Sequence, residues 1–149
     1  MATFWPTPEP GDIVDCRFPQ DKSLAPGPKG RPTLVTKVET FEDEGGVIHV
    51  IVDVAYGTSQ DTQDVYPGEF VVPKNHPGSG LTKDTKFDLG NTFRVNFDDE
   101  WFAPASLPHP KVPPKRGMLK PSSDQIIKRK ISSALAELSK IGKIKKRNM

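Results

Sequence analysis

Candidate chemistry in this sequence rests on one arginine and on a run of polar side chains that follows an apolar segment. Arg31 precedes Pro32 at the start of a β-branched run, and its planar guanidinium suits two-pronged contact with a phosphate. Thr58, Ser59 and Gln60 end the run VAYGTSQ and can donate hydrogen bonds to a phosphate or a base. Each group also has a plainer interpretation. Arg31 would be a surface arginine paired with a nearby carboxylate, and YGTSQ a polar turn at a strand end.

Other kinds of site find little support in the sequence. The histidines His49, His76 and His109 are widely spaced and Cys16 is the single cysteine, so no metal site is expected. There is no phosphate-binding loop, dinucleotide fingerprint or nucleophile elbow. Because no histidine lies near Cys16 in the sequence, we expect this cysteine to be a small buried hydrophobe. A single cysteine allows no intramolecular disulfide, which favours a reducing, intracellular setting.

Charge divides the chain into two unlike parts. Residues 1–110 hold 9 Lys+Arg and 17 Asp+Glu, whereas residues 111–149 hold 12 and 2. The net charges are therefore −8 and +10, an asymmetry typical of a basic arm on an acidic body. No stretch approaches the roughly 20 apolar residues of a membrane helix, and the first residues lack the basic and apolar regions of a signal peptide. The sequence therefore predicts a soluble protein, with no membrane-spanning segment and no export by a signal peptide.

The elements that must position these side chains are short strands. Alternating or β-branched runs predict the strands 11–18, 31–41, 47–59, 69–73, 85–90 and 92–97. Gly45 and Gly46 between the second and third runs predict a hairpin turn. In the first strand, Val14, Cys16 and Phe18 form the face expected to be buried. Short strands at this regular spacing predict a mostly β fold closed into a small barrel.

Three segments are predicted. The barrel domain covers residues 1–103, and residues 104–121, with six prolines, form a stiff linker. Residues 122–149 form a basic amphipathic helix that begins with Ser122 and Gln125 spaced as a capping box. The expected apolar stripe of this helix consists of Ile127, Ile131, Leu135, Leu138 and Ile141.

The basic helix admits more than one role. Its apolar stripe would dock on the acidic body or on a partner, and the lysines and arginine of the run KIKKR would attract nucleic acid. A membrane-surface helix is a further alternative, although the helix lacks the aromatic anchors expected of one.

Three short motifs carry a resemblance to a known family. They are GDIV at residues 11–14, the pair Arg31-Pro32, and VAYGTSQ at residues 54–60. In this order and at these separations they resemble the PemK/MazF family of toxins, over residues 10 to 72. The pieces GLTKDTKFDLG and FDDEWF look like the equivalent region of a PemK-like branch. The resemblance implies an SH3-like barrel of the CcdB/MazF type that forms a cytoplasmic homodimer. It also implies metal-independent cleavage of single-stranded RNA, and an antitoxin protein that blocks the RNA groove.

The resemblance also implies the residues of the site. In this family the RNA 2'-hydroxyl attacks the adjacent phosphate, which requires a base, an acid and stabilisation of the phosphorane. Arg31 matches the family's arginine and would stabilise the phosphorane, and Thr58 matches its threonine. No catalytic base is assigned, and Asp12, Asp61 and His49 are the candidates. The predicted RNA-binding residues are Arg17, Lys22, Lys29, Ser59 and Gln60.

Two hypotheses follow. The first is a growth-inhibiting endoribonuclease, in which Arg17, Lys22, Lys29 and Arg31 form a positive rim on a body whose net negative charge would otherwise repel RNA. The second is a non-catalytic barrel that binds nucleic acid, or inhibits a protein target, through its basic C-terminal helix, as in the gyrase-poisoning toxins with this barrel. The first hypothesis requires Arg31 and Thr58 to face one groove.

Overall fold

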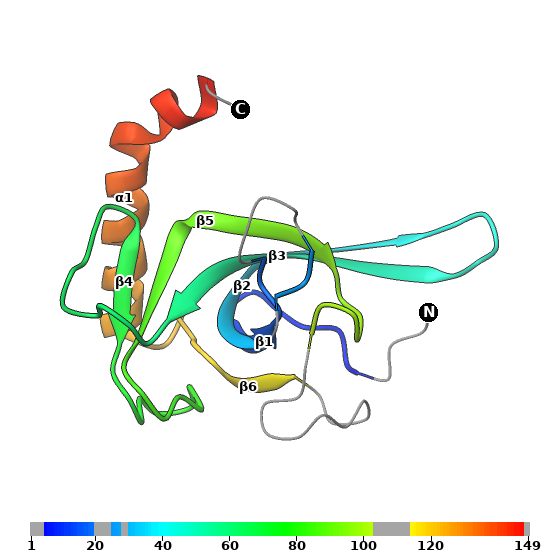
Figure 1. Ribbon diagram of the computed structural model, residues 1–149, viewed down its shortest axis with the longest axis horizontal. Coiled ribbons are helices and arrows are strands. Elements are labelled where there is room, and N and C mark those ends of the chain that lie inside the picture. The colour runs from blue at the N-terminus through cyan, green and yellow to red at the C-terminus, as the bar shows by residue number, and fades with distance from the viewer. Residues whose placement is uncertain (1–4, 20–24, 28–29, 103–113, 148–149) are drawn as a thin grey trace.

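The computed structural model describes residues 5–19, 25–27, 30–102 and 114–147, with side chains described up to Ile141 (Figure 1). Its elements are β1 (Asp12–Cys16), β2 (Arg31–Glu42), β3 (Ile48–Thr58), β4 (Glu69–Val72), β5 (Thr85–Asn96), β6 (Lys115–Met118) and α1 (Gln125–Arg147). The six strands form one antiparallel sheet in the order β4-β5-β3-β2-β1-β6, and α1 lies beside β4 and β5. The predicted mostly β class is confirmed.

The two edges of the sheet approach each other without pairing as strands. In the described part of the chain, strand pairing runs from β4 to β6 and does not close into a barrel. The loop between β4 and β5 reaches the opposite edge, where Met118 N donates a hydrogen bond of 2.8 Å to the Gly78 carbonyl. The sheet is therefore strongly curved, and a loop rather than a strand pair joins its edges.

Both faces of β1 are buried, which corrects the expectation of a single buried face. Val14 and Cys16 belong to one apolar cluster, with Val52, Val54 and Phe102. Ile13 on the other face is 0% exposed and belongs to a second cluster, with Phe87. Because β1 lies between β2 and β6 in a curved sheet, apolar side chains cover it on both sides.

The hairpin of β2 and β3 extends beyond the rest of the sheet as a two-stranded arm (Figure 1). Its turn lies at the predicted place, where Asp43 Oδ1 accepts hydrogen bonds from the backbone N–H groups of Gly45 and Val47, both at 2.9 Å. Gly46 has a φ of 81°, which glycine adopts without strain. β5 is one continuous strand where two were predicted, with a register shift against β3 between Ala55 and Tyr56.

Part of the predicted linker belongs to the sheet. β6 pairs with β1, and the Pro114 carbonyl accepts a hydrogen bond of 3.0 Å from Asp15 N. The four residues of β6 include no proline, so their backbone can pair at an edge although prolines surround them. The rest of the predicted linker up to residue 113 lies outside the described residues.

Helix α1 begins at Gln125, and Asp124 caps it in place of the predicted Ser122 capping box. Asp124 Oδ1 accepts hydrogen bonds from Ile126 N at 3.1 Å and Ile127 N at 3.2 Å. Its Oδ2 lies 2.7 Å from His76 Nε2. The cap therefore ties the start of α1 to the loop between β4 and β5.

The buried face of α1 differs from the predicted stripe at one position. Ile127 and Ala134 are fully buried in the second cluster and Ile131 packs against it, whereas Leu135 is 52% exposed. Ala134 lies seven residues after Ile127, at helical spacing, and takes the place expected for Leu135. No helix among the described residues is long and apolar enough to span a membrane.

The Asp124 cap should make stability depend on acid pH. Its pKa lies below the ordinary 3.8, mainly because Ile127 N–H and then His76 donate to the carboxylate. A carboxyl whose pKa falls on folding stabilises the protein above its unfolded pKa, and the contribution is lost as pH falls through the folded value. We expect Asp124→Ala to lower the urea midpoint at about pH 6 and to have little effect near pH 2. Glu137→Ala, later on the same helix, is the control. An equal effect of Asp124→Ala at both pH values would contradict the assignment.

Candidate functional site

A cavity of about 230 Å³ lies where three parts of the chain meet beside β6. The start of β2 contributes Gly30–Pro32, and the end of β3 contributes Gly57–Ser59. The turn before β5 contributes Leu81, Thr82, Lys83 and Thr85, and Arg116 on β6 completes the lining. We call this cavity the Arg31 pocket. Its lining includes three cations and several hydroxyls, and no carboxylate or imidazole among the described residues.

The pairing of β2 with β3 brings the two predicted catalytic residues together. Thr33 pairs with Tyr56, and the same register continued by two residues places Arg31 opposite Thr58. Gly57 allows this close approach, since a Cβ there would lie 2.3 Å from the Pro32 carbonyl oxygen. Arg31, Thr58 and Ser59 all line the Arg31 pocket, so the described residues meet the geometric requirement of the ribonuclease hypothesis.

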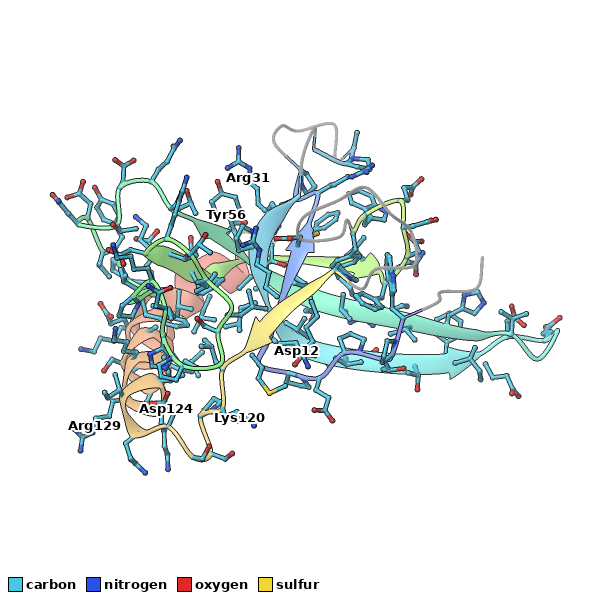
Figure 2. All side chains as sticks on the ribbon, turned by 90° about the horizontal axis from the view of Figure 1, so that it is seen from below. Asp12, Arg31, Tyr56, Lys120, Asp124 and Arg129 are labelled. Atoms are coloured by element: carbon cyan, nitrogen blue, oxygen red, sulfur yellow. The ribbon has the colours of Figure 1, made fainter. Side chains whose placement is uncertain are left out.

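Arg31 has no ionic partner among the described residues. Its Nε is a buried nitrogen without a hydrogen-bond acceptor, and no carboxylate in the described chain lies within ion-pair distance of its guanidinium. A buried donor normally has a partner, because leaving it unpaired costs about 1–3 kcal/mol. The alternative of a surface arginine paired with a carboxylate therefore has no support in this part of the chain. Figure 2 shows the Arg31 side chain directed away from the body of the sheet.

Hydrogen bonds within the turn and from β5 fix the segment that carries Thr58 and Ser59. Thr58 Oγ1 accepts a hydrogen bond of 3.1 Å from Gln60 N. Lys86 on β5 pairs with Thr58 on β3. Its Nζ donates hydrogen bonds to the carbonyls of Asp61 at 3.0 Å and Asp64 at 2.7 Å. A buried lysine thus anchors the loop that leaves β3.

The other predicted RNA-binding residues do not gather around the Arg31 pocket in the described structure. Arg17 follows β1 and its backbone N donates to the Trp101 carbonyl at 2.6 Å, but its side chain does not line the pocket. Gln60 lies just outside the lining. Lys22 and Lys29 lie outside the described residues.

The three candidate bases lie elsewhere. Asp12 is buried beside Lys115, with its Oδ1 3.3 Å from Nζ, and Figure 2 shows it well separated from Arg31. His49 lies on the hairpin arm, where Nε2 contacts Asp43 Oδ2 at 2.8 Å. Asp61 is close in sequence to Thr58 but does not line the pocket. The described pocket therefore offers charge stabilisation and hydrogen bonds, and none of the three candidates supplies a base there.

Lys83 and Arg116 are the pocket cations that the sequence did not predict. Arg116 Nε donates a hydrogen bond of 2.7 Å to Asp15 Oδ1 on β1. Burial raises the pKa of Asp15, and the hydrogen bond from Arg116 opposes that shift. Arg116 lies in a proline-rich segment without strand alternation, so only the pairing of β6 with β1 shows where it belongs. Lys83 lies in a polar turn with no pattern of its own.

Cys16 is buried between β2 and Phe102, as the sequence predicts. Burial, and secondly the charge of Asp15, raise the pKa of its thiol to about 12. We expect a thiol reagent at about pH 8 to leave Cys16 unmodified in the folded protein and to modify it rapidly in denaturant. Fast modification of the folded protein, at the rate seen in denaturant, would contradict this burial.

Comparisons with known proteins leave the family resemblance as a prediction. A comparison of the chain with protein-family profiles gave no match, and a comparison with curated proteins gave none either. In the described part of the chain, no three side chains of histidine, cysteine, aspartate or glutamate are grouped so that they could hold a metal ion.

Proposed function

We propose that this protein is an endoribonuclease of the PemK/MazF toxin type that binds single-stranded RNA at the Arg31 pocket. The observation that supports it most is that Arg31 and Thr58, from two separate motifs, line the same cavity. A cavity lined by Arg31, Lys83 and Arg116, without a carboxylate among its described residues, suits a phosphate on a body of net negative charge.

In the proposed reaction the oxygen of the RNA 2'-hydroxyl bonds to the adjacent phosphorus and the bond from phosphorus to the 5'-oxygen breaks. The 2'-hydroxyl gives up its proton, and the departing 5'-oxygen takes one up. The products are a cyclic phosphate and a 5'-hydroxyl end. Arg31 donates to the non-bridging phosphate oxygens as charge develops on them, and the Thr58 and Ser59 hydroxyls donate further hydrogen bonds. No carboxylate in the described chain pairs with the Arg31 guanidinium, so its terminal nitrogens can bind the phosphate without first breaking an ion pair.

The wider features of the toxin family enter as part of the same proposal. We propose that the curved sheet is an SH3-like barrel of the CcdB/MazF type, and the hydrogen bond from Met118 N to the Gly78 carbonyl supports this by joining its edges. The protein would act in the cytoplasm as a homodimer, and a cognate antitoxin would cover the Arg31 pocket.

A second candidate is a non-catalytic module that binds nucleic acid, or inhibits a protein target, through its basic C-terminal helix. The observation that favours it is the composition of the Arg31 pocket, whose described lining includes no carboxylate or imidazole to accept the proton of the 2'-hydroxyl. Such a module would bind nucleic acid through the helix and leave it intact.

The experiment that separates the two candidates incubates a long single-stranded RNA with the protein in EDTA, followed by analysis of the fragment ends. The nuclease proposal expects discrete cuts with 5'-hydroxyl ends and cyclic phosphates. Intact RNA in the presence of a folded protein would refute it and favour the binding module.

A further inference from the structure

Arg116 brings a second guanidinium to the Arg31 pocket from a part of the chain that the family resemblance does not cover. It lies on β6, at residues 115–118, whereas the resemblance extends from residue 10 to 72. The pocket is thus completed by β6, a strand that is distant in sequence from residues 10–72. The family resemblance therefore assigns no role to Arg116.

A β-bulge directs Arg116. Ile13 on β1 pairs with Gly117, and the next residue, Val14, pairs with Lys115, so Arg116 is the extra residue on β6. Bulges of this kind change the direction of one side chain while the strands on either side stay paired. The backbone at Arg116 is also confined, because a Cβ on Gly80 would lie 2.1 Å from the Arg116 carbonyl oxygen. The same close contact brings the turn that carries Lys83 against β6.

Asp15 holds the guanidinium of Arg116. The Asp15 side chain is 3% exposed and that of Arg116 is 23% exposed, and the bond between them uses only Nε. An arginine has five N–H donors. The terminal nitrogens of Arg116 donate to no other group among the described residues, so they can bind an anion in the pocket. Asp15 on β1 pairs with Pro32 on β2, and Pro32 is next to Arg31 in the chain. This pairing places Arg31 and Arg116 around one cavity.

We propose that Arg116 binds an RNA phosphate in the Arg31 pocket and that Asp15 is the positioning residue that holds its guanidinium. This inference rests on the proposed binding of RNA at that pocket. Arg116 supplies affinity for the polyanion, while Arg31, beside Thr58 in the pocket, supplies stabilisation of the reacting phosphate. Loss of Arg116 therefore weakens binding more than it slows the chemical step.

The test measures binding of a single-stranded RNA oligonucleotide with 2'-O-methyl groups, which cannot be cleaved by 2'-hydroxyl attack. For Arg116→Gln we expect the dissociation constant to rise about 10-fold or more, the usual effect of losing a charge-assisted hydrogen bond. The slope of log affinity against log salt should fall by about 0.7, the value for one phosphate contact on a single strand. Arg94→Gln is the matched control, because Arg94 is an arginine on β5 paired with Glu39 and Asp53, and it should change neither quantity.

Asp15→Asn tests the positioning role. It should weaken binding in the wild-type background and have no further effect when Arg116→Gln is already present, because residues that act through one contact are non-additive. The double variant also replaces the buried ion pair by two neutral amides, so it leaves no buried carboxylate unpaired if Arg116→Gln alone fails to fold. If Asp15 had a purely structural role, Asp15→Asn would lower thermal stability and leave the affinity for the oligonucleotide unchanged.

The outcomes distinguish this inference from the proposed function. Unchanged affinity and salt slope in a folded Arg116→Gln protein would overturn the inference, even if wild-type protein cleaves RNA. Arg116-dependent binding together with failure to cleave RNA would refute the nuclease and leave the inference standing. Failure of the wild-type protein to bind the oligonucleotide at low salt would overturn both.

Discussion

Replacing Arg31 with alanine should slow RNA cleavage by about 10²–10³-fold, the usual effect of removing one donor that stabilises a transition-state anion. Arg31 lines the Arg31 pocket beside Thr58, and its Nε is buried without an acceptor among the described residues. Its guanidinium makes no ion pair in this part of the chain, so its loss should cost the fold little. The backbone of Arg31 still pairs with Cys16 in the variant.

The measurement is the single-turnover rate of cleavage, compared with the thermal midpoint of each protein. Arg31→Lys keeps the charge but not the planar fork, so its rate should fall between those of wild type and alanine. Arg94→Ala removes an exposed arginine of β5 that does not line the pocket, and it should leave the rate unchanged. A wild-type cleavage rate in a folded Arg31→Ala protein would show that Arg31 takes no part in the cleavage reaction.

Gly117→Ala should destabilise the protein by about 3 kcal/mol, at the upper end of ordinary overpacking. A Cβ at this position would lie 2.4 Å from the Gly78 carbonyl oxygen and equally close to the Ser79 backbone. These are backbone atoms on a loop whose Gly78 carbonyl already accepts a hydrogen bond from Met118 N, so they cannot move away cheaply. The methyl group would separate β6 from the loop that joins it to the opposite edge.

Thermal unfolding followed by circular dichroism tests this, with an expected fall of roughly 10 °C in the midpoint for a chain of this size. Gly45→Ala is the matched control, since a Cβ there would meet only Asp43 Oδ1 at an ordinary 3.4 Å. If the two variants had the same midpoint, the close contact between β6 and the loop would be wrong.

The strands that sequence reasoning located correctly are those with a strong local pattern. The β-branched runs before and after Gly45 and Gly46 predict the hairpin of β2 and β3, because alternation and a glycine turn are both local features. β6 has neither feature. Its four residues become a strand only because β1 offers an unpaired edge, and a local pattern does not record such long-range pairing.

The candidate site likewise combines residues that local sequence patterns predict with a residue that only the fold brings to the pocket. Arg31 and Thr58 belong to motifs on strands that are neighbours in the sheet, and the sequence could predict both. Arg116 reaches the Arg31 pocket through a bulge, and its register follows from the fold alone. The candidate bases do not line the Arg31 pocket in the described structure, and Asp12 and His49 are paired with Lys115 and Asp43 away from it.

Helix α1 was predicted from its spacing, but which face is buried depends on what it packs against. Leu135 fits an apolar stripe with Ile127 and Ile131, yet the small side chain of Ala134 faces the second cluster. A sequence pattern predicts how wide the apolar face of a helix is. The packing of α1 against β4 and β5 determines how the helix is rotated about its axis, and so which side chains are buried.

RNA is proposed to bind at the Arg31 pocket, and NMR spectroscopy of the protein titrated with the 2'-O-methyl oligonucleotide is the decisive test of that claim. The Arg31 Nε–H resonance should shift, together with the backbone amides of Thr58, Ser59 and Lys83, since these groups line one cavity. The hairpin turn at Gly45 and Gly46 should not respond. Shifts confined to α1, with Arg31 and Thr58 unaffected, would contradict the claim and assign binding to the basic helix.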